Sequence, residues 1–272
     1  MKQTARLSAP EAYILVSLPR YDIRKALKLG FMGLLAQGVL RSEDEAREGL
    51  IRTRHVIHLR VAPNLPDDLL PLTASLVKVV RAAEPRDGVM KEIVKQSLRE
   101  YGNNLFGFPH KLVCPALAAR GLAEDRRVRL LGIIPSHRYE RTSAGDAEKA
   151  RIEGAMQEAR AIPRYLDRDP VQVAALVAAA GSAIFLVDEL QSHYQSIAKT
   201  LRDKVGGDAA SLNTSTGDSG SAGFDGGSFD AASFDAGSFN FGGIDFGSFD
   251  FGSFDAGFSD AGGGDSGGGS SC

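Results

Sequence analysis

The chain has 272 residues, with 32 Lys and Arg, 34 Asp and Glu, two Cys and a formal net charge of -2. This length suits one large domain or two small ones. Cys114 lies in an apolar stretch and Cys272 is the last residue, which excludes a disulfide framework and fits a reducing compartment. The first twenty residues carry no small-residue cleavage site, so we expect no signal peptide and a cytoplasmic protein.

The near-neutral total hides a division of charge along the chain. Every Lys and Arg lies at or before Lys204, whereas ten Asp and no basic residue follow from Asp208 onward. Residues 1–207 therefore carry about +8 and the tail carries about -10. Such an asymmetry indicates contact with nucleic acid or another polyanion, or binding between the two parts of the chain.

The first third of the chain predicts helices followed by a strand. The segment "SAPEAYILVSL" (8–18) predicts a helix capped by its first serine. The apolar spacing over residues 21–40 is helical, and we expect Gly30 to divide it into two short helices. Residues 50–62 alternate between two faces, which predicts a strand.

A similar order follows. Residues 69–83 and 90–105 predict amphipathic helices, and 108–125 predict a helical run. The next segment, "RRVRLLGIIPSHRYERTSAGDAEKA", predicts strand, turn, strand and helix. Thr142 is expected to cap that helix, and Gly145 is expected to allow close packing.

The two stretches resemble each other. Placing Gly121 on Gly38 aligns "LAARGLA" with "LLAQGVL" at an offset of 83 residues, which indicates a degenerate duplication. Helices followed by a hairpin are the order of a winged helix-turn-helix, and "HRYERTSAGDAEKA" resembles the closing wing strand and next helix of many bacterial winged-helix proteins. We expect a mainly α fold with short β-hairpins. Its parts are a winged-helix-like unit at 1–66, a second one at 67–150, a helical extension at 151–205 and a disordered tail at 206–272.

The helical extension contains the most apolar segment of the chain. A long helix is expected to begin at Asp169-Pro170 and to continue to Gly206. Within it, "VAALVAAAGSAIFLV" (173–187) is uncharged, but a membrane-spanning helix needs about 20 apolar residues. We expect a buried core helix, with membrane association as the alternative.

The layout resembles a little-studied family of bacterial membrane proteins with glycine-rich C-terminal tails. The similarity lies in "LSAPEAYILVSLP" and "ALKLGFMGLLAQGVL", in "ARGLAED" and "RYERTSAG", in "GSAIFLVDELQ" and in the end of the tail, "GGGDSGGGSS". The resemblance implies a membrane setting and no particular activity.

No residue pattern indicates an enzyme, a metal site or a cofactor. His55 and His58 would face opposite sides of a strand. His110 and Cys114 would share a helix face as two zinc ligands, but no further ligands accompany them, and a buried cysteine is the favoured interpretation. Phosphate-binding and hydrolase motifs are absent from the sequence.

Basic residues in the second hairpin form the candidate polyanion-binding set. Wings with Arg can lie along phosphates. However, Pro115 falls in the expected recognition helix and its neighbours are Ala and Leu, which offer few hydrogen bonds to base edges. DNA binding is therefore less favoured than protein interaction. The set comprises Arg126, Arg127, Arg129, Arg138 and Arg141.

The tail repeats Phe every five residues, usually with Ser before it and Asp after it. Its glycine content favours a disordered arm of weakly adhesive Phe residues over a five-residue β-helix, and a passive solubilising tail is the simplest alternative. The candidate interaction residues are Phe224, Phe229, Phe234, Phe239, Phe249 and Phe254.

Together these features predict a non-enzymatic interaction or scaffold protein with an unidentified protein partner and a tail that contacts its own body. The first alternative is a DNA-binding regulator autoinhibited by its acidic tail. The second is a membrane-associated member of the resembled family.

Overall fold

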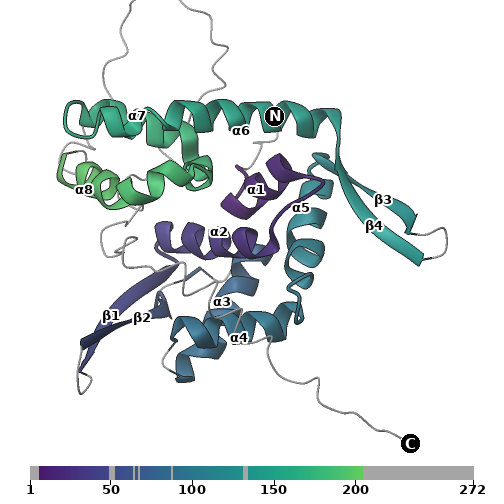
Figure 1. Ribbon diagram of the computed structural model, residues 1–272, viewed down its shortest axis with the longest axis horizontal. Coiled ribbons are helices and arrows are strands. Elements are labelled where there is room, and N and C mark those ends of the chain that lie inside the picture. Colours follow the sequence, from purple (N-terminus) through teal and green to yellow (C-terminus); the bar gives the residue numbers. More distant parts are fainter. Residues whose placement is uncertain are drawn as a thin grey trace, which may run out of the picture.

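The structure, a computed structural model, describes residues 6–48, 53–63, 65–66, 68–86, 88–130 and 134–204. Over these residues the protein is mainly helical with two small antiparallel hairpins, as the sequence predicts (Figure 1). The Phe repeat and the rest of the predicted tail lie outside the described residues.

The first unit consists of two helices and a hairpin. Leu40 pairs with Val61 at the base of the hairpin, and the register continues to Glu48 and Thr53. The elements are α1 (Ala9–Ser17), α2 (Ile23–Ala36), β1 (Leu40–Glu48) and β2 (Thr53–Val61).

The second unit repeats this order after an additional helix. In its hairpin, Ala123 pairs with Arg141 at the base. The elements are α3 (Pro71–Ala83), the 3-10 turn η1 (Glu84–Arg86), α4 (Met90–Tyr101), the π-helical turn η2 (Pro109–Val113), α5 (Cys114–Ala119), β3 (Ala123–Leu130), β4 (Ile134–Arg141) and α6 (Ser143–Ala159).

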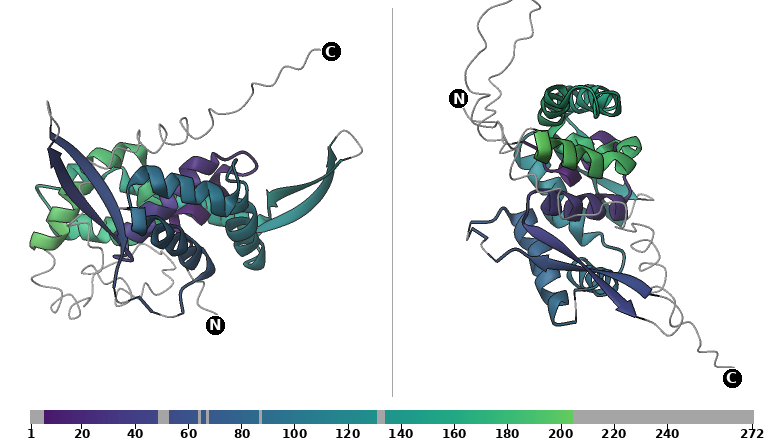
Figure 2. Two further views of the ribbon diagram at one scale, coloured as in Figure 1. Left: turned by 90° about the horizontal axis from the view of Figure 1, so that it is seen from below. Right: turned by 90° about the vertical axis from the view of Figure 1, so that its left-hand side faces the viewer.

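The remaining elements form a compact C-terminal layer. They are η3 (Ile162–Arg164), α7 (Pro170–Ala180), the 3-10 helices η4 (Gly181–Leu186) and η5 (Asp188–His193), and α8 (Tyr194–Lys204). Figures 1 and 2 show α6 and α7 along one edge, α1 and α2 in the centre, and α3 and α4 on the opposite side. The two hairpins project at opposite ends of this body.

Helix α2 corrects one expectation. It is continuous through Gly30, where the sequence predicted a division into two helices. A Cβ at Gly30 would lie 2.9 Å from Leu76 Cδ1 of α3, so the glycine allows α2 and α3 to approach closely. Its role is tertiary packing.

The long C-terminal helix is also a wrong prediction. Asp169 and Pro170 begin α7 as expected, because the Asp169 carboxylate accepts a hydrogen bond from Gln172 N at 2.9 Å. The helix then ends at Gly181, whose φ of +53° belongs to the left-handed region. The chain reverses into α8, and the apolar run is buried over Val177, Ile184 and Val187 as predicted.

Within the described part of the chain, no single helix is long and apolar enough to cross a membrane. Two consecutive segments, Pro170–Leu186 and Asp188–Leu201, together have the length and apolar composition of a membrane span, but the angle between them is 118°.

Backbone geometry repeats between the two units at the predicted offset. At the end of α2, Gly38 N donates to Leu35 O and Val39 N to Leu34 O; at the end of α5, Gly121 N donates to Ala118 O and Leu122 N to Leu117 O. Gly38 and Gly121 have φ values of +69° and +72°. This repeated geometry supports the duplication.

The core joins both units and the C-terminal layer. Buried side chains from α1 through α8 belong to one contiguous apolar cluster, which includes Leu15, Leu35, Leu76, Val177 and Ile197. The hairpins are therefore mounted on a common helical body.

Candidate interaction surface

The second hairpin extends away from the helical body (Figures 1 and 2). Its base packs against α5 and α6, whereas the first hairpin lies along α2, α3 and α4. The second hairpin also carries the predicted polyanion-binding residues.

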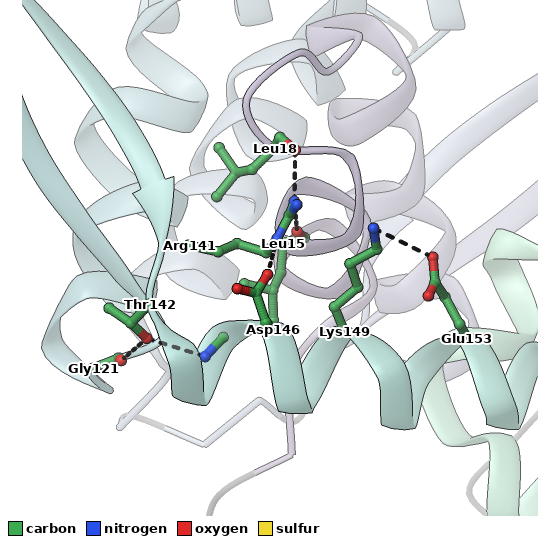
Figure 3. A network of polar contacts seen from close by, with 9 residues as sticks. Leu15, Leu18, Gly121, Arg141, Thr142, Asp146, Lys149 and Glu153 are labelled. Atoms are coloured by element: carbon green, nitrogen blue, oxygen red, sulfur yellow. Dashed lines mark hydrogen bonds and ion pairs between the residues drawn. The ribbon is translucent and has the colours of Figure 1, made fainter.

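Thr142 joins the hairpin to α6. Its hydroxyl donates to Gly121 O at 2.6 Å and accepts from Gly145 N at 3.0 Å, as Figure 3 shows in part. A Cβ at Gly145 would lie 2.0 Å from Leu122 O, so only glycine fits this crossing without a backbone shift. Both predictions for Thr142 and Gly145 are confirmed.

Arg141, the last residue of β4, ties the hairpin to α1. Its Nη1 donates to the carbonyl oxygens of Leu15 and Leu18, and its Nε donates to Asp146 at 2.8 Å (Figure 3). The side chain is only 19% exposed. These contacts use its guanidinium inside the protein, where it acts as an anchor for the hairpin base.

Arg126 and Arg138 lie at the surface and face each other across the hairpin. Arg126 contacts Glu124 at 2.6 Å and Glu140 at 3.1 Å, and Arg138 contacts Glu140 at 3.5 Å. Exposed pairs of this kind contribute little to stability because water and salt screen them, so an anionic ligand could compete with them.

The other two residues of the predicted set, Arg127 and Arg129, lie on β3 opposite His137 and Pro135. Their side chains are outside the described part of the structure. The set is thus divided between an anchor, Arg141, and positions farther along the hairpin.

A row of three aromatic rings lies at the base of the second hairpin. The His110 ring centroid is 5.7 Å from that of Phe106 and 6.0 Å from that of Tyr139. Phe106 is 52% exposed. The row joins the loop after α4, the π-helical turn and β4, so it gathers residues from three separate segments.

The local backbone explains how Phe106 and His110 are presented. Leu105 is buried with a φ of +60°, a left-handed conformation that costs a non-glycine residue about 1–2 kcal/mol. Phe106 N donates to Asn104 Oδ1 at 3.2 Å in the same turn. Phe106 then points outward while Phe108 packs on Tyr101 at 5.3 Å. The wider π-helical turn carries His110, and such turns are frequent at functional sites.

Sequence reasoning missed this row. It treated His110 only as a partner for Cys114, and no local spacing connects Phe106 with a tyrosine on a distant strand. The available signal was an aromatic residue at a polar, glycine-containing loop, "GNNLFGF", which is an unusual place for a side chain that normally belongs to the core.

Cys114 is buried beside Tyr21, with 3.9 Å between Sγ and the hydroxyl oxygen. Burial raises the pKa of Cys114 to about 11, so the thiol is protonated at neutral pH and is a poor nucleophile. Within the described residues no group of three or more His, Cys, Asp or Glu could hold a metal ion.

The helices that precede the hairpins offer little to a DNA groove. Most of α2 is buried, including Leu27, Phe31 and Leu34. In α5 the exposed positions include Pro115 and Ala119, which lack hydrogen-bonding side chains. The surface nearest to a nucleic acid would be the hairpin itself.

Comparison with known proteins gives no relative: no family model matches the chain, and no curated protein is significantly similar to it.

Proposed function

We propose that the protein is a non-enzymatic interaction or scaffold protein that presents its second hairpin and its tail to a protein partner. The observation that carries this proposal is the contrast within the hairpin. Arg141 and Thr142 fix its base to α1, α5 and α6, whereas Arg126 and Arg138 farther out are exposed. A rigidly held, exposed element suits recognition, because it loses little conformational entropy when a partner binds.

The surface chemistry supports a protein partner over a specific DNA site. Exposed Phe106 and half-buried Tyr139 are residue types that dominate protein interfaces. The helices that would enter a major groove in a winged helix are buried or apolar.

A pull-down tests the proposal. Full-length protein, protein lacking residues 208–272, and the full-length double variant Arg126→Glu/Arg138→Glu are used as bait under identical conditions. We expect at least one partner to be lost with either change. Identical partners and identical self-association for all three baits would contradict the proposal.

DNA binding is the second candidate, motivated by the facing arginines on the hairpin. Autoinhibition by the acidic tail predicts that removal of residues 208–272 strengthens binding to duplex DNA, with affinity falling steeply as salt rises. Arg126→Glu should weaken that binding. Absence of a gel shift at low salt would eliminate this function.

The resemblance to glycine-tailed bacterial membrane proteins remains a third proposal. Its support is the apolar composition of Pro170–Leu186 together with Asp188–Leu201. Fractionation of cells followed by carbonate washing tests it, since an inserted protein stays with the membrane pellet.

A further inference from the structure

The equivalent faces of the two hairpins are covered differently. Because Leu40 pairs with Val61 and Ala123 with Arg141, Leu59 on β2 corresponds to Tyr139 on β4. Leu59 is fully buried, and its backbone N donates to Gly88 O at 3.0 Å.

The segment that covers this part of β2, Gly88 and Val89, packs tightly against it. A Cβ at Gly88 would lie 2.5 Å from Leu59 O, and His58 pairs with Val89 at the start of α4. Tyr139, by contrast, meets the π-helical turn through His110, and the helices packed on the base of the hairpin are α5 and α6. Tyr139 is half-buried and its ring lies beside His110. The second hairpin therefore lacks, among the described residues, the segment that closes the first.

The open face combines aromatic rings with positive charge at its border. Phe106, His110 and Tyr139 form the row, with Phe106 the most exposed of them. Lys111, next to His110, is exposed. Arg138 lies on the opposite face of the hairpin, with Arg126 and Glu140. Asp125 lies opposite Tyr139, so a ligand carboxylate would be directed to Lys111 rather than along β3.

We propose that this face binds the Phe-Asp repeats of the chain's own tail, residues 224–255. Most repeats place an aromatic ring next to a carboxylate, which matches rings bordered by Lys111. The tail contains no basic residue, so its charge complements that of the body. This inference rests on the proposed function, in which the tail is an interaction element.

The length of the tail allows the contact. Phe224 follows Lys204 by 20 residues, a length that spans at most about 65–70 Å. A folded body of this size has a radius of gyration of about 16 Å, so the repeats reach every face of it. Tethering gives an effective concentration on the order of millimolar, which makes a small, weak contact sufficient.

A second copy of the chain is the less suitable occupant. A stable interface between proteins buries about 1,200 Å² or more in total. A full aromatic side chain buries only about 150–250 Å², and two of the three rings here are already partly covered. The exposed row is therefore too small to hold an untethered copy by itself.

Photo-crosslinking in the full-length protein tests the proposal. A benzophenone-bearing phenylalanine analogue replaces Phe234, which Asp235 follows, and crosslinked peptides are mapped by mass spectrometry. We expect crosslinks to peptides containing residues 106–111 and 138–141 of the same chain. The double variant Phe106→Ala/Lys111→Glu should lower their yield at least fivefold.

Leu70→Ala is the matched control, because Leu70 is 69% exposed but lies at the start of α3. It should leave the yield unchanged. Crosslinks spread over other faces, or equally sensitive to Leu70→Ala, would overturn the proposal. Crosslinks mainly between isotopically distinct chains would show that the face binds the tail of a second copy, which would overturn the intramolecular contact. Loss of partners in the pull-down bears on the proposed function alone, whereas the position of these crosslinks bears on the tail contact.

Discussion

Leu59 and Tyr139 occupy the same position in two hairpins with matching register at their bases, yet one is fully buried and the other is half-buried. The first hairpin packs against α3 and α4, and the second packs against α5 and α6. At the next equivalent position, where β2 has Val61, Arg141 reaches α1 through its long side chain. The base of the first hairpin is thus part of the core, whereas the second hairpin is an anchored, accessible element.

The largest effect should come from adding a side chain at Gly145, where α6 crosses the backbone of Leu122 at the base of the second hairpin. Gly145→Ala places a Cβ 2.0 Å from Leu122 O and should lower the free energy of unfolding by about 3 kcal/mol, measured by urea denaturation. Gly154→Ala, in the same helix with open space around it, should instead raise it by about 0.5–1 kcal/mol. Equal effects of the two substitutions would show that the crossing is not tight.

Truncating the equivalent residues Leu59 and Tyr139 should lower the free energy of unfolding by different amounts. Leu59→Ala removes a fully buried side chain and should cost about 3 kcal/mol of unfolding free energy. Tyr139→Ala should cost less, about 1 kcal/mol, because the side chain is only partly buried. The same urea titrations measure both, and equal losses would contradict the proposed difference in covering.

Arg141 should matter for stability and Arg126 should not. Arg141→Met leaves the carbonyls of Leu15 and Leu18 without a charged donor and should cost about 2 kcal/mol. It should also speed amide exchange in β4. Arg126→Met, at an exposed pair, should leave stability almost unchanged. A surface role for Arg141 predicts the opposite: little destabilisation by either substitution.

The smallest effect concerns Cys114, which at the offset of 83 residues matches Phe31 of α2. Burial raises its pKa from 9.0 to about 11, so the folded protein keeps a proton that the unfolded chain loses above pH 9. Stability present below pH 9 is therefore lost as the pH rises toward 11. Between pH 8 and pH 10 the wild type should lose about 1 kcal/mol more than Cys114→Ala, measured by thermal unfolding. Parallel pH profiles would show that the thiol titrates normally.

The sequence predicted what short-range chemistry determines. Ser8 and Glu11 start α1, with Ser8 N donating to the Glu11 carboxylate at 2.7 Å, and Thr142 and Asp169 start their helices in the same local way. Each of these signals lies within a few residues of its partner.

Features that depend on distant contacts escaped prediction. Gly30 suggested a helix break, but the glycine instead makes room for Leu76 of α3. Strand β1 is mostly charged and has no clear alternation, so only its pairing with β2 identifies it. The aromatic row likewise joins Phe106 to Tyr139 across segments that no periodicity relates.

Hydrogen exchange tests the central claim, that the second hairpin is open for the tail whereas the first is closed by the body. Full-length protein is compared with a full-length variant in which the six candidate Phe residues of the tail are replaced by Ser. The account predicts faster exchange in residues 106–113 and 134–141 of the variant, with no change in 53–61. Unchanged exchange in all three segments, or an equal increase in 53–61, would contradict it.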